Sequence, residues 1–211
     1  MEEYLDLLWN LSFDALRDVQ LEFSQNHTLI RTEADIQGML LCAINARRGP
    51  EISFEAHSEI TWYEADEYRS FRRDISIFDP LNIETNDVNR ITLSKGFRHR
   101  GPMLGIELKY IRSNDPLAII HHKTWEDLER LIRYSHRFYA SNGTIGCPKK
   151  FVIIIGCSPD TDVQAIKQIF IANIGRFMNE VEQRGLPWFN MIQTIIQPVI
   201  FSIDESILLW D

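Results

Sequence analysis

Hydrophobic and polar positions in the first 50 residues recur with a helical period. Residues 2–24 carry apolar side chains at broadly helical spacing, and the segment Ser12–Asp14 predicts a break between two helical pieces. A second helical pattern predicts a helix over about residues 33–47, with Thr32 as its N-cap and Gly49–Pro50 as its stop. Helices therefore precede the first strand of the chain.

From residue 51 the period changes to two, which is the period of a strand with one buried face. Apolar and polar residues alternate in three segments, residues 52–65, 71–80 and 101–111, and polar turn material lies between them. This alternation predicts three strands of the antiparallel type, one after another in the sequence.

The last third of the chain combines helical spacing with short apolar runs. Helical spacing predicts helices over residues 123–140 and 160–185. A β-branched run at residues 149–159 predicts a strand buried on both faces, and residues 188–203 predict a final strand that Pro198 makes irregular or places at an edge. The order helix, three strands, helix, strand, helix, strand predicts a mixed α/β sandwich.

Length and composition predict one domain. The 211 residues are 45% hydrophobic and 25% charged, so we expect a helical decoration over residues 1–27 and a single domain over residues 28–211. No apolar run reaches the roughly 18 residues of a membrane span, and the chain begins with acidic residues, so we expect a cytoplasmic protein without a membrane partner. Cys42, Cys147 and Cys157 lack the close pairing of a metal site and are expected as free thiols.

Net charge limits the partners that the chain can bind. The formal charge is −8, whereas a surface that binds nucleic acid is usually basic. Positive residues nevertheless gather in the middle of the chain. The candidate contacts to nucleic acid are Arg73, Lys95, Arg98, Arg100, Arg112 and Arg133. For Arg133, a solvated helix face paired with Glu129 explains the same pattern equally well.

Charged residues interrupt the apolar strand pattern at residues 103–110, which read MLGIELKY. Because side chains alternate along a strand, Glu107 and Lys109 share one face, and the same rule separates Asp74 from Ile75 in the preceding predicted strand. If the two strands are neighbours, Asp74, Glu107 and Lys109 converge. Two carboxylates and an ammonium supply oxygen ligands for Mg²⁺ and a positive group beside an attacking water, which predicts a hydrolytic phosphodiester site.

These residues resemble the motif of a known superfamily. The segments RRD (residues 72–74) and GIELKY (residues 105–110) are preceded by a helix that carries Glu33 and followed by WEDLERLIRY (residues 125–134). Over roughly residues 28–157 this arrangement resembles the PD-(D/E)XK nuclease superfamily of restriction-endonuclease-like enzymes. The resemblance implies a three-layer α/β/α sandwich with a central mixed sheet, and it makes residues 28–211 a PD-(D/E)XK nuclease-like domain.

The resemblance also implies the role of each site residue. Asp74 and Glu107 correspond to the metal ligands, Lys109 to the residue that assists the attacking water, and Glu33 to an acid of the first helix that many members add to the metal site. Arg73 replaces the proline that names the motif. The implied activity is that of a Mg²⁺-dependent endodeoxyribonuclease, with Mn²⁺ able to substitute. The implied partners are nucleic acid, DNA by family habit, and a second copy or a partner subunit.

Three other interpretations stay open. Glu107 and Lys109 also fit a salt bridge on the solvated face of an antiparallel sheet. A non-catalytic interaction or regulatory subunit that retains the fold would suit the acidic charge. RNA cleavage by an intracellular toxin or defence effector differs only in its substrate. His121 and His122 are expected in an exposed loop, because no further ligand is spaced to complete a metal site with them.

Overall fold

The computed structural model describes residues 2–49, 52–59, 61–63, 70–82, 96–97, 103–126, 149–183, 196–201 and 206–208. The helices in these ranges are α1 (Glu2–Gln25), α2 (Glu33–Asn45), a segment over residues 117–126, α5 (Val163–Gln183) and the short 3₁₀ helix η1 (Pro80–Asn82). Among the helices described, none combines the length and the apolar character needed to cross a membrane.

A six-stranded mixed sheet is the larger of two sheets. In spatial order its strands are β1 (Glu55–Ser58), β4 (Ile75–Phe78), β6 (Met103–Ile111), β7 (Lys149–Cys157), β8 (Ile196–Phe201) and β9 (Ser206–Leu208). Strands β1, β4 and β6 run antiparallel, β6, β7 and β8 run parallel, and β9 is antiparallel to β8. The smaller sheet contains β3 (Ser70–Arg72), β2 (Thr61–Tyr63) and β5 (Gly96–Phe97) in that order. The predicted mixed α/β class is confirmed.

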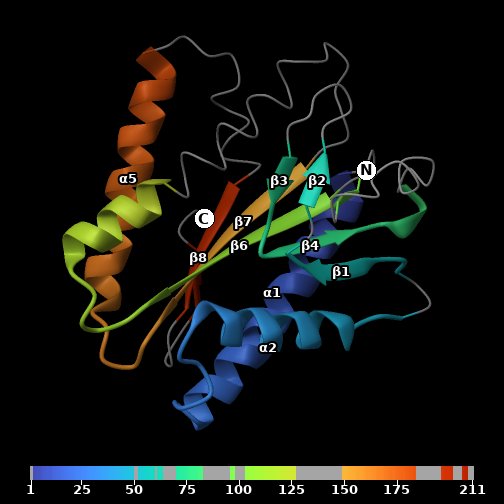
Figure 1. Cartoon of the computed structure of the whole chain (residues 1–211), viewed down its shortest axis with the longest axis horizontal. Coiled ribbons are helices and arrows are strands. Elements are labelled where there is room, and N and C mark those ends of the chain that lie inside the picture. Colours follow the sequence, from blue (N-terminus) through green and yellow to red (C-terminus); the bar gives the residue numbers. More distant parts are fainter. Residues whose placement is uncertain are drawn as a thin grey trace.

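Helices lie on both sides of the six-stranded sheet, with α1 and α2 on one side and α5 on the other (Figure 1). Between the sheet and the α1/α2 layer is an apolar core. Its sheet residues occupy alternate positions and include Ile75, Ile77, Leu104, Ile106, Leu108, Val152 and Ile154. Ile153 and Ile155 point to the opposite face because side chains alternate, and they are buried as well. The strand predicted to be buried on both faces, β7, is therefore confirmed.

Helix α1 is uninterrupted, so the predicted break at Ser12–Asp14 is wrong. The buried Ser12 hydroxyl donates a hydrogen bond to the Leu8 carbonyl oxygen at 2.7 Å, which satisfies the polar side chain inside the helix. A row of apolar side chains on α1 packs into the same core as α2 and the sheet. Residues 1–27 therefore contribute to the core of the domain and are more than a decoration of it.

Helix α2 begins close to where the sequence predicts it. Thr32 is the N-cap: its hydroxyl accepts the N–H of Asp35 at 3.3 Å, and the Asp35 carboxylate accepts the N–H of Thr32 at 2.8 Å. The same carboxylate accepts the N–H of Arg31 at 2.9 Å, which is the largest cause of a pKa of Asp35 below its ordinary value. This capping box fixes the position of Glu33, the first residue of the helix.

Two predicted strands are each divided in the structure. Residues 52–65 contain β1 and β2, which belong to different sheets, and Glu59 between them has a φ of 58°, in the left-handed region. Residues 71–80 contain the end of β3 and all of β4, again in different sheets. The alternation of apolar and polar residues continues across both breaks, so the pattern alone does not reveal them. The second break leaves Arg73 and Asp74 directly before β4.

The expectation that Pro198 marks an edge strand is wrong, because β8 has β7 on one side and β9 on the other. Pro198 faces Ile153 of β7, and the described residues of β9 pair with Val199–Phe201 of β8.

The helix predicted from residue 123 already begins at residue 117. His121 and His122 are therefore helical, and the loop predicted for them is wrong. The His121 carbonyl oxygen accepts a hydrogen bond from the Asn173 side chain of α5 at 3.0 Å, so this helix and α5 contact each other. The part of the prediction beyond residue 126 lies outside the described residues.

Candidate functional site

The predicted site lies where β4 and β6 part. The two strands are antiparallel neighbours, as the convergence of Asp74, Glu107 and Lys109 required. Their register ends at Ile75 opposite Ile106, and β6 continues beyond this point to Ile111. The continuing part of β6 presents backbone amides along the edge that β4 no longer covers.

Carboxylates accept hydrogen bonds from two of these amides. The Leu108 N–H donates to Oδ2 of Asp74 at 2.6 Å, and the Tyr110 N–H donates to Oε1 of Glu33 at 3.4 Å. Leu108 and Tyr110 are two positions apart, so their amides point to the same edge of the strand. Asp74 and Glu33 thus lie one after the other along β6, although they are 41 positions apart in the sequence.

The backbone of Asp74 is held by hydrogen bonds from two other segments. The Gln37 side chain donates to the Asp74 carbonyl oxygen at 2.7 Å, and the Glu59 N–H donates to the same oxygen at 3.1 Å. Since Ile75 lies opposite Ile106, the next opposing positions are Asp74 and Glu107. The sequence analysis missed Gln37, although its position four residues after Glu33 places both on the same face of α2.

Lys109 lies beside the acid of the first helix. Its Nζ is 3.6 Å from Oε1 of Glu33, and the two side chains are 19% and 47% exposed. Lys109 also lines a small pocket of about 10 Å³ together with Lys123 and Thr124 from the helix over residues 117–126. That volume holds about one water molecule. Positive groups from two elements therefore meet at the carboxyl end of β6.

Two other titratable groups near this end of the sheet stay protonated. The Tyr110 hydroxyl donates a hydrogen bond to the Ile30 carbonyl oxygen at 3.1 Å, and burial raises the pKa of Tyr110 above its ordinary value. Burial also raises the pKa of the Cys157 thiol to about 12. Cys157 is thus a neutral thiol at physiological pH.

Glu107 lies in the interior and forms an ion pair with Arg73. Oε2 of Glu107 is 3.6 Å from Nη1 of Arg73, and the two side chains are 9% and 0% exposed. The structure therefore corrects the prediction that Arg73 contacts nucleic acid, because a buried guanidinium does not reach a phosphate at the surface. The burial of Glu107 also disagrees with a salt bridge on a solvated sheet face.

Of the remaining residues predicted to contact nucleic acid, the structure describes Arg112. Arg112 is exposed and follows directly after β6, on the same end of the sheet as Lys109. Lys95, Arg98, Arg100 and Arg133 lie outside the described residues.

The carboxylates of Asp74 and Glu107 can be compared with the oxygen ligands that Mg²⁺ prefers. Within the described ranges, no three His, Cys, Asp or Glu side chains lie close enough together to hold a metal ion, so Asp74, Glu107 and Glu33 do not form one shared cluster. Mg²⁺ in proteins is commonly held by one or two carboxylates, while water and substrate phosphates complete its octahedral shell. Asp74 and the opposing Glu107 match that smaller set in their donor chemistry.

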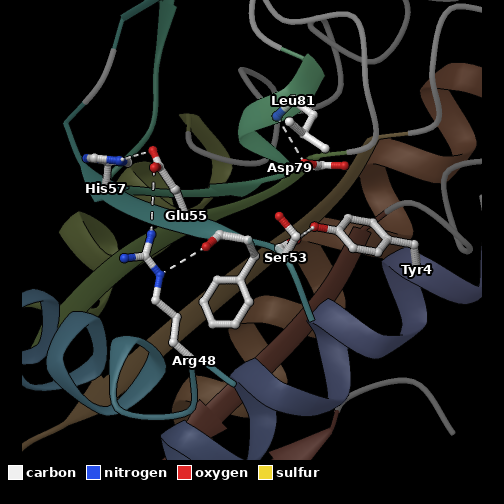
Figure 2. A network of polar contacts seen from close by, with 8 residues as sticks. Tyr4, Arg48, Ser53, Glu55, His57, Asp79 and Leu81 are labelled. Atoms are coloured by element: carbon white, nitrogen blue, oxygen red, sulfur yellow. Dashed lines mark hydrogen bonds and ion pairs between the residues drawn. The ribbon is translucent and has the colours of Figure 1, made fainter. Parts of the chain in front are cut away.

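A second polar cluster lies at the edge of the sheet formed by β1 (Figure 2). The Tyr4 hydroxyl donates a hydrogen bond to the Ser53 carbonyl oxygen at 2.6 Å, and burial raises the pKa of Tyr4 to about 12, so it remains a donor. Glu55 lies 3.8 Å from Nη2 of Arg48 and 3.0 Å from Nε2 of His57. These contacts join α1, the end of α2 and β1, and we interpret them as structural.

The chain matches no family model, no curated protein and no solved structure in the comparisons with known proteins.

Proposed function

We propose that this chain is a metal-dependent nuclease that hydrolyses phosphodiester bonds in DNA. The observation that carries the proposal is the meeting of Asp74, Glu33 and Lys109 on one stretch of β6, with Glu107 opposite Asp74. These residues come from three separate segments of the sequence. A purely structural strand end needs neither two carboxylates on its amides nor a lysine between them.

Each residue has a role that its position supports. Asp74 and Glu107 would hold a divalent cation, which would supply Lewis-acid chemistry for phosphodiester hydrolysis. Lys109, flanked by the two amide-bound carboxylates, orients the attacking water and neutralises charge that develops on the phosphate. Glu33 keeps the Lys109 ammonium in place through their ion pair. Gln37 holds the backbone of Asp74.

The fold that we propose for this activity is the restriction-endonuclease-like α/β/α sandwich. It is supported by a mixed sheet with helices on both sides and by the order α2, β4, β6, helix, β7 along the chain. The absence of matching families and structures means that this proposal depends on the arrangement of the chain's own residues.

Substrate and partners follow from charge and motif together. DNA is proposed because the resembling superfamily acts mainly on it, and Arg112 and Lys123 are exposed near the site. A net charge of −8 leaves little positive surface for a long duplex, so we propose that a second copy of the chain or a partner subunit completes the binding surface. The free thiols of Cys42 and Cys157 suit a reducing compartment such as the cytoplasm.

A non-catalytic subunit that retains this fold is the second candidate function. The ion pair between the buried Glu107 and Arg73 favours it, because a carboxylate that is already paired with a cation has less need of a metal ion. Under this alternative, Asp74 and Glu33 only cap the edge of β6.

Cleavage assays separate the two candidates. The purified protein is incubated with supercoiled plasmid, linear duplex DNA, single-stranded DNA and RNA, in Mg²⁺, in Mn²⁺ and in excess chelator. The variants Asp74→Asn and Lys109→Met test the site. Asn can still accept the Leu108 N–H, so Asp74→Asn removes the charge and keeps an acceptor for this hydrogen bond. Asp79→Asn is the matched control, because Asp79 lies at the other end of β4 and accepts the Leu81 N–H.

We expect metal-dependent cleavage that falls by about 10²-fold or more in both site variants and stays unchanged in the control. Cleavage of RNA alone would change the substrate and keep the mechanism. Folded wild-type protein that cuts none of these substrates would favour the non-catalytic subunit, and equal cleavage by wild type and Asp74→Asn would contradict the proposed site.

A further inference from the structure

The ion pair between Arg73 and Glu107 differs from other ion pairs of the molecule in its burial. Both of its side chains are less than a tenth exposed, whereas the pairs Arg47–Asp18 and Arg176–Glu180 each have a partner that is more than half exposed. An exposed pair contributes little to stability, but removing one partner of a buried pair leaves a charge in the interior that is strongly unfavourable. Arg73 is therefore a buried positive partner of Glu107, at a position where the loss of either side chain is costly.

Arg73 also lies next to the proposed metal site in the sequence and in space. It immediately precedes Asp74, and it pairs with the carboxylate opposite Asp74. A cation that binds between Asp74 and Glu107 would therefore approach a carboxylate that already has a positive partner. Two cations close to one carboxylate repel each other, and the repulsion is weakly screened in a site with little water.

We propose that Arg73 is a built-in counter-cation at Glu107, a positioning residue that holds this carboxylate in place in the metal-free protein and that weakens the binding of a divalent cation. The inference rests on the proposed metal-dependent function. It implies that the site is assembled before metal arrives and that the metal is held loosely, mainly through Asp74 and the substrate phosphate. Removing the guanidinium should make the folded state depend on metal and should tighten metal binding.

The test compares Arg73→Met, which removes the charge at similar length, with Arg73→Lys, which keeps it. Mn²⁺ binding is measured by calorimetry at pH 8, and thermal unfolding is followed in chelator and in Mn²⁺. In chelator we expect the melting temperature of Arg73→Met to fall by about 5 °C or more. In Mn²⁺ we expect this variant to recover most of the loss and to bind Mn²⁺ about tenfold more tightly than wild type. Arg73→Lys should bind Mn²⁺ like wild type.

Each part of the proposal can fail separately. Arg73→Met that loses stability equally in chelator and in Mn²⁺, with unchanged Mn²⁺ affinity, would overturn the inference and leave an ordinary structural ion pair. If Arg73→Met does not fold in chelator, refolding it across a range of Mn²⁺ concentrations replaces the melting curves: recovery supports the proposal, and no recovery contradicts it. Equal gains in affinity for the Lys and Met variants would also contradict it, because charge would not be the cause.

Two further variants separate this inference from the proposed function. The double variant Arg73→Met/Glu107→Gln should regain the stability lost in chelator, because neither charge remains, whereas a continued loss would contradict the pairing. Asp74→Asn should abolish Mn²⁺ binding in the wild-type background. If neither wild type nor Arg73→Met binds Mn²⁺ in a manner that depends on Asp74, the proposed function fails. If wild type binds Mn²⁺ through Asp74 but Arg73→Met binds it no more tightly, only the role of Arg73 fails.

Discussion

The neighbouring parallel strands β6 and β7 are alike on one face and opposite in character on the other. On the face toward α1 and α2, Leu108 of β6 lies beside Ile154 of β7, and both are buried. On the other face, the register places Glu107 beside Ile153 and Lys109 beside Ile155. The same positions of the same sheet are thus ionic in one strand and apolar in the next.

This difference shows that the charges on β6 are not a response to solvent. Ile153 and Ile155 are buried, and Glu107 next to them is only 7% exposed. An isoleucine in place of Glu107 would favour a more stable fold, because burying a carboxylate is costly unless it is paired. The retention of charge in β6 against this cost is what distinguishes the candidate site from an ordinary strand end.

The largest expected effect comes from making β7 resemble β6. Ile155→Lys places an ammonium at a fully buried position, so we expect the free energy of unfolding to fall by about 3–5 kcal/mol. The reverse change, Lys109→Ile, should alter it by less than about 1 kcal/mol, because Lys109 is partly exposed and its ion pair with Glu33 is screened. Urea unfolding of both variants measures the difference. Tolerance of Ile155→Lys would show that this face is solvated along both strands.

On the face where the strands agree, the two strands should respond alike. Leu108→Ala and Ile154→Ala each create a cavity in the core shared with α1 and α2, so each should cost about 2–5 kcal/mol of stability. Urea unfolding again provides the measurement, with the double variant to test whether the neighbours couple. A large loss for Ile154→Ala together with no loss for Leu108→Ala would mean that β6 is held mainly by its ionic face.

The same contrast explains how much of the fold the sequence could predict. Period and capping predicted α2 with its N-cap Thr32 and the doubly buried β7, whereas the pairing of β4 with β6 was only the condition for the convergence of Asp74 and Glu107. These features are local, or follow from one face of one element. The breaks after β1 and β3 were missed because alternation continues through them, and the break at Ser12 was wrong because the hydroxyl bonds within its own helix.

For the candidate site, the sequence named residues that lie along or next to β6, but not what surrounds them, and the predicted convergence of Asp74, Glu107 and Lys109 stays a prediction. The alternation in β6 placed Glu107 and Lys109 on one face, and the same rule in the preceding predicted strand gave Asp74. Glu33 was then added as a candidate because the sequence resembles the PD-(D/E)XK motif. The burial of Arg73 was not predictable from its sequence neighbours, because arginine is usually exposed and its partner Glu107 is 34 positions away in the sequence. Gln37 could have been found from its helical spacing to Glu33, whereas its acceptor on Asp74 depends on the tertiary fold.

A smaller effect on stability and cleavage is expected at the edge of β6, where a carboxylate of α2 and not a strand accepts the Tyr110 N–H. β7 pairs with β8 along Phe151–Gly156, whereas Glu33 supplies the acceptor for Tyr110 of β6. Glu33→Gln keeps an acceptor and loses the charge near Lys109, so stability should change by less than about 1 kcal/mol while cleavage falls about tenfold. Steady-state cleavage at several Mg²⁺ concentrations measures the second effect. Unchanged cleavage would remove Glu33 from the site and leave it as a strand cap.

The smallest expected effect concerns the cap that positions Glu33 at this edge. The pKa of Asp35 is lowered in the folded state, chiefly by the hydrogen bond from the Arg31 N–H, so its ionised form favours folding. This contribution is complete above the unfolded-state pKa of about 4 and is lost as pH falls through the lower folded-state pKa. Asp35→Asn should therefore be less stable than wild type at pH 7, by less than about 1 kcal/mol because the residue is partly exposed, and equally stable near pH 2. Urea unfolding at both pH values measures this gap. A gap of the same size at both pH values would mean that the charge of Asp35 does not hold the start of α2, and that Glu33 is kept on β6 by its own contacts with Tyr110 and Lys109.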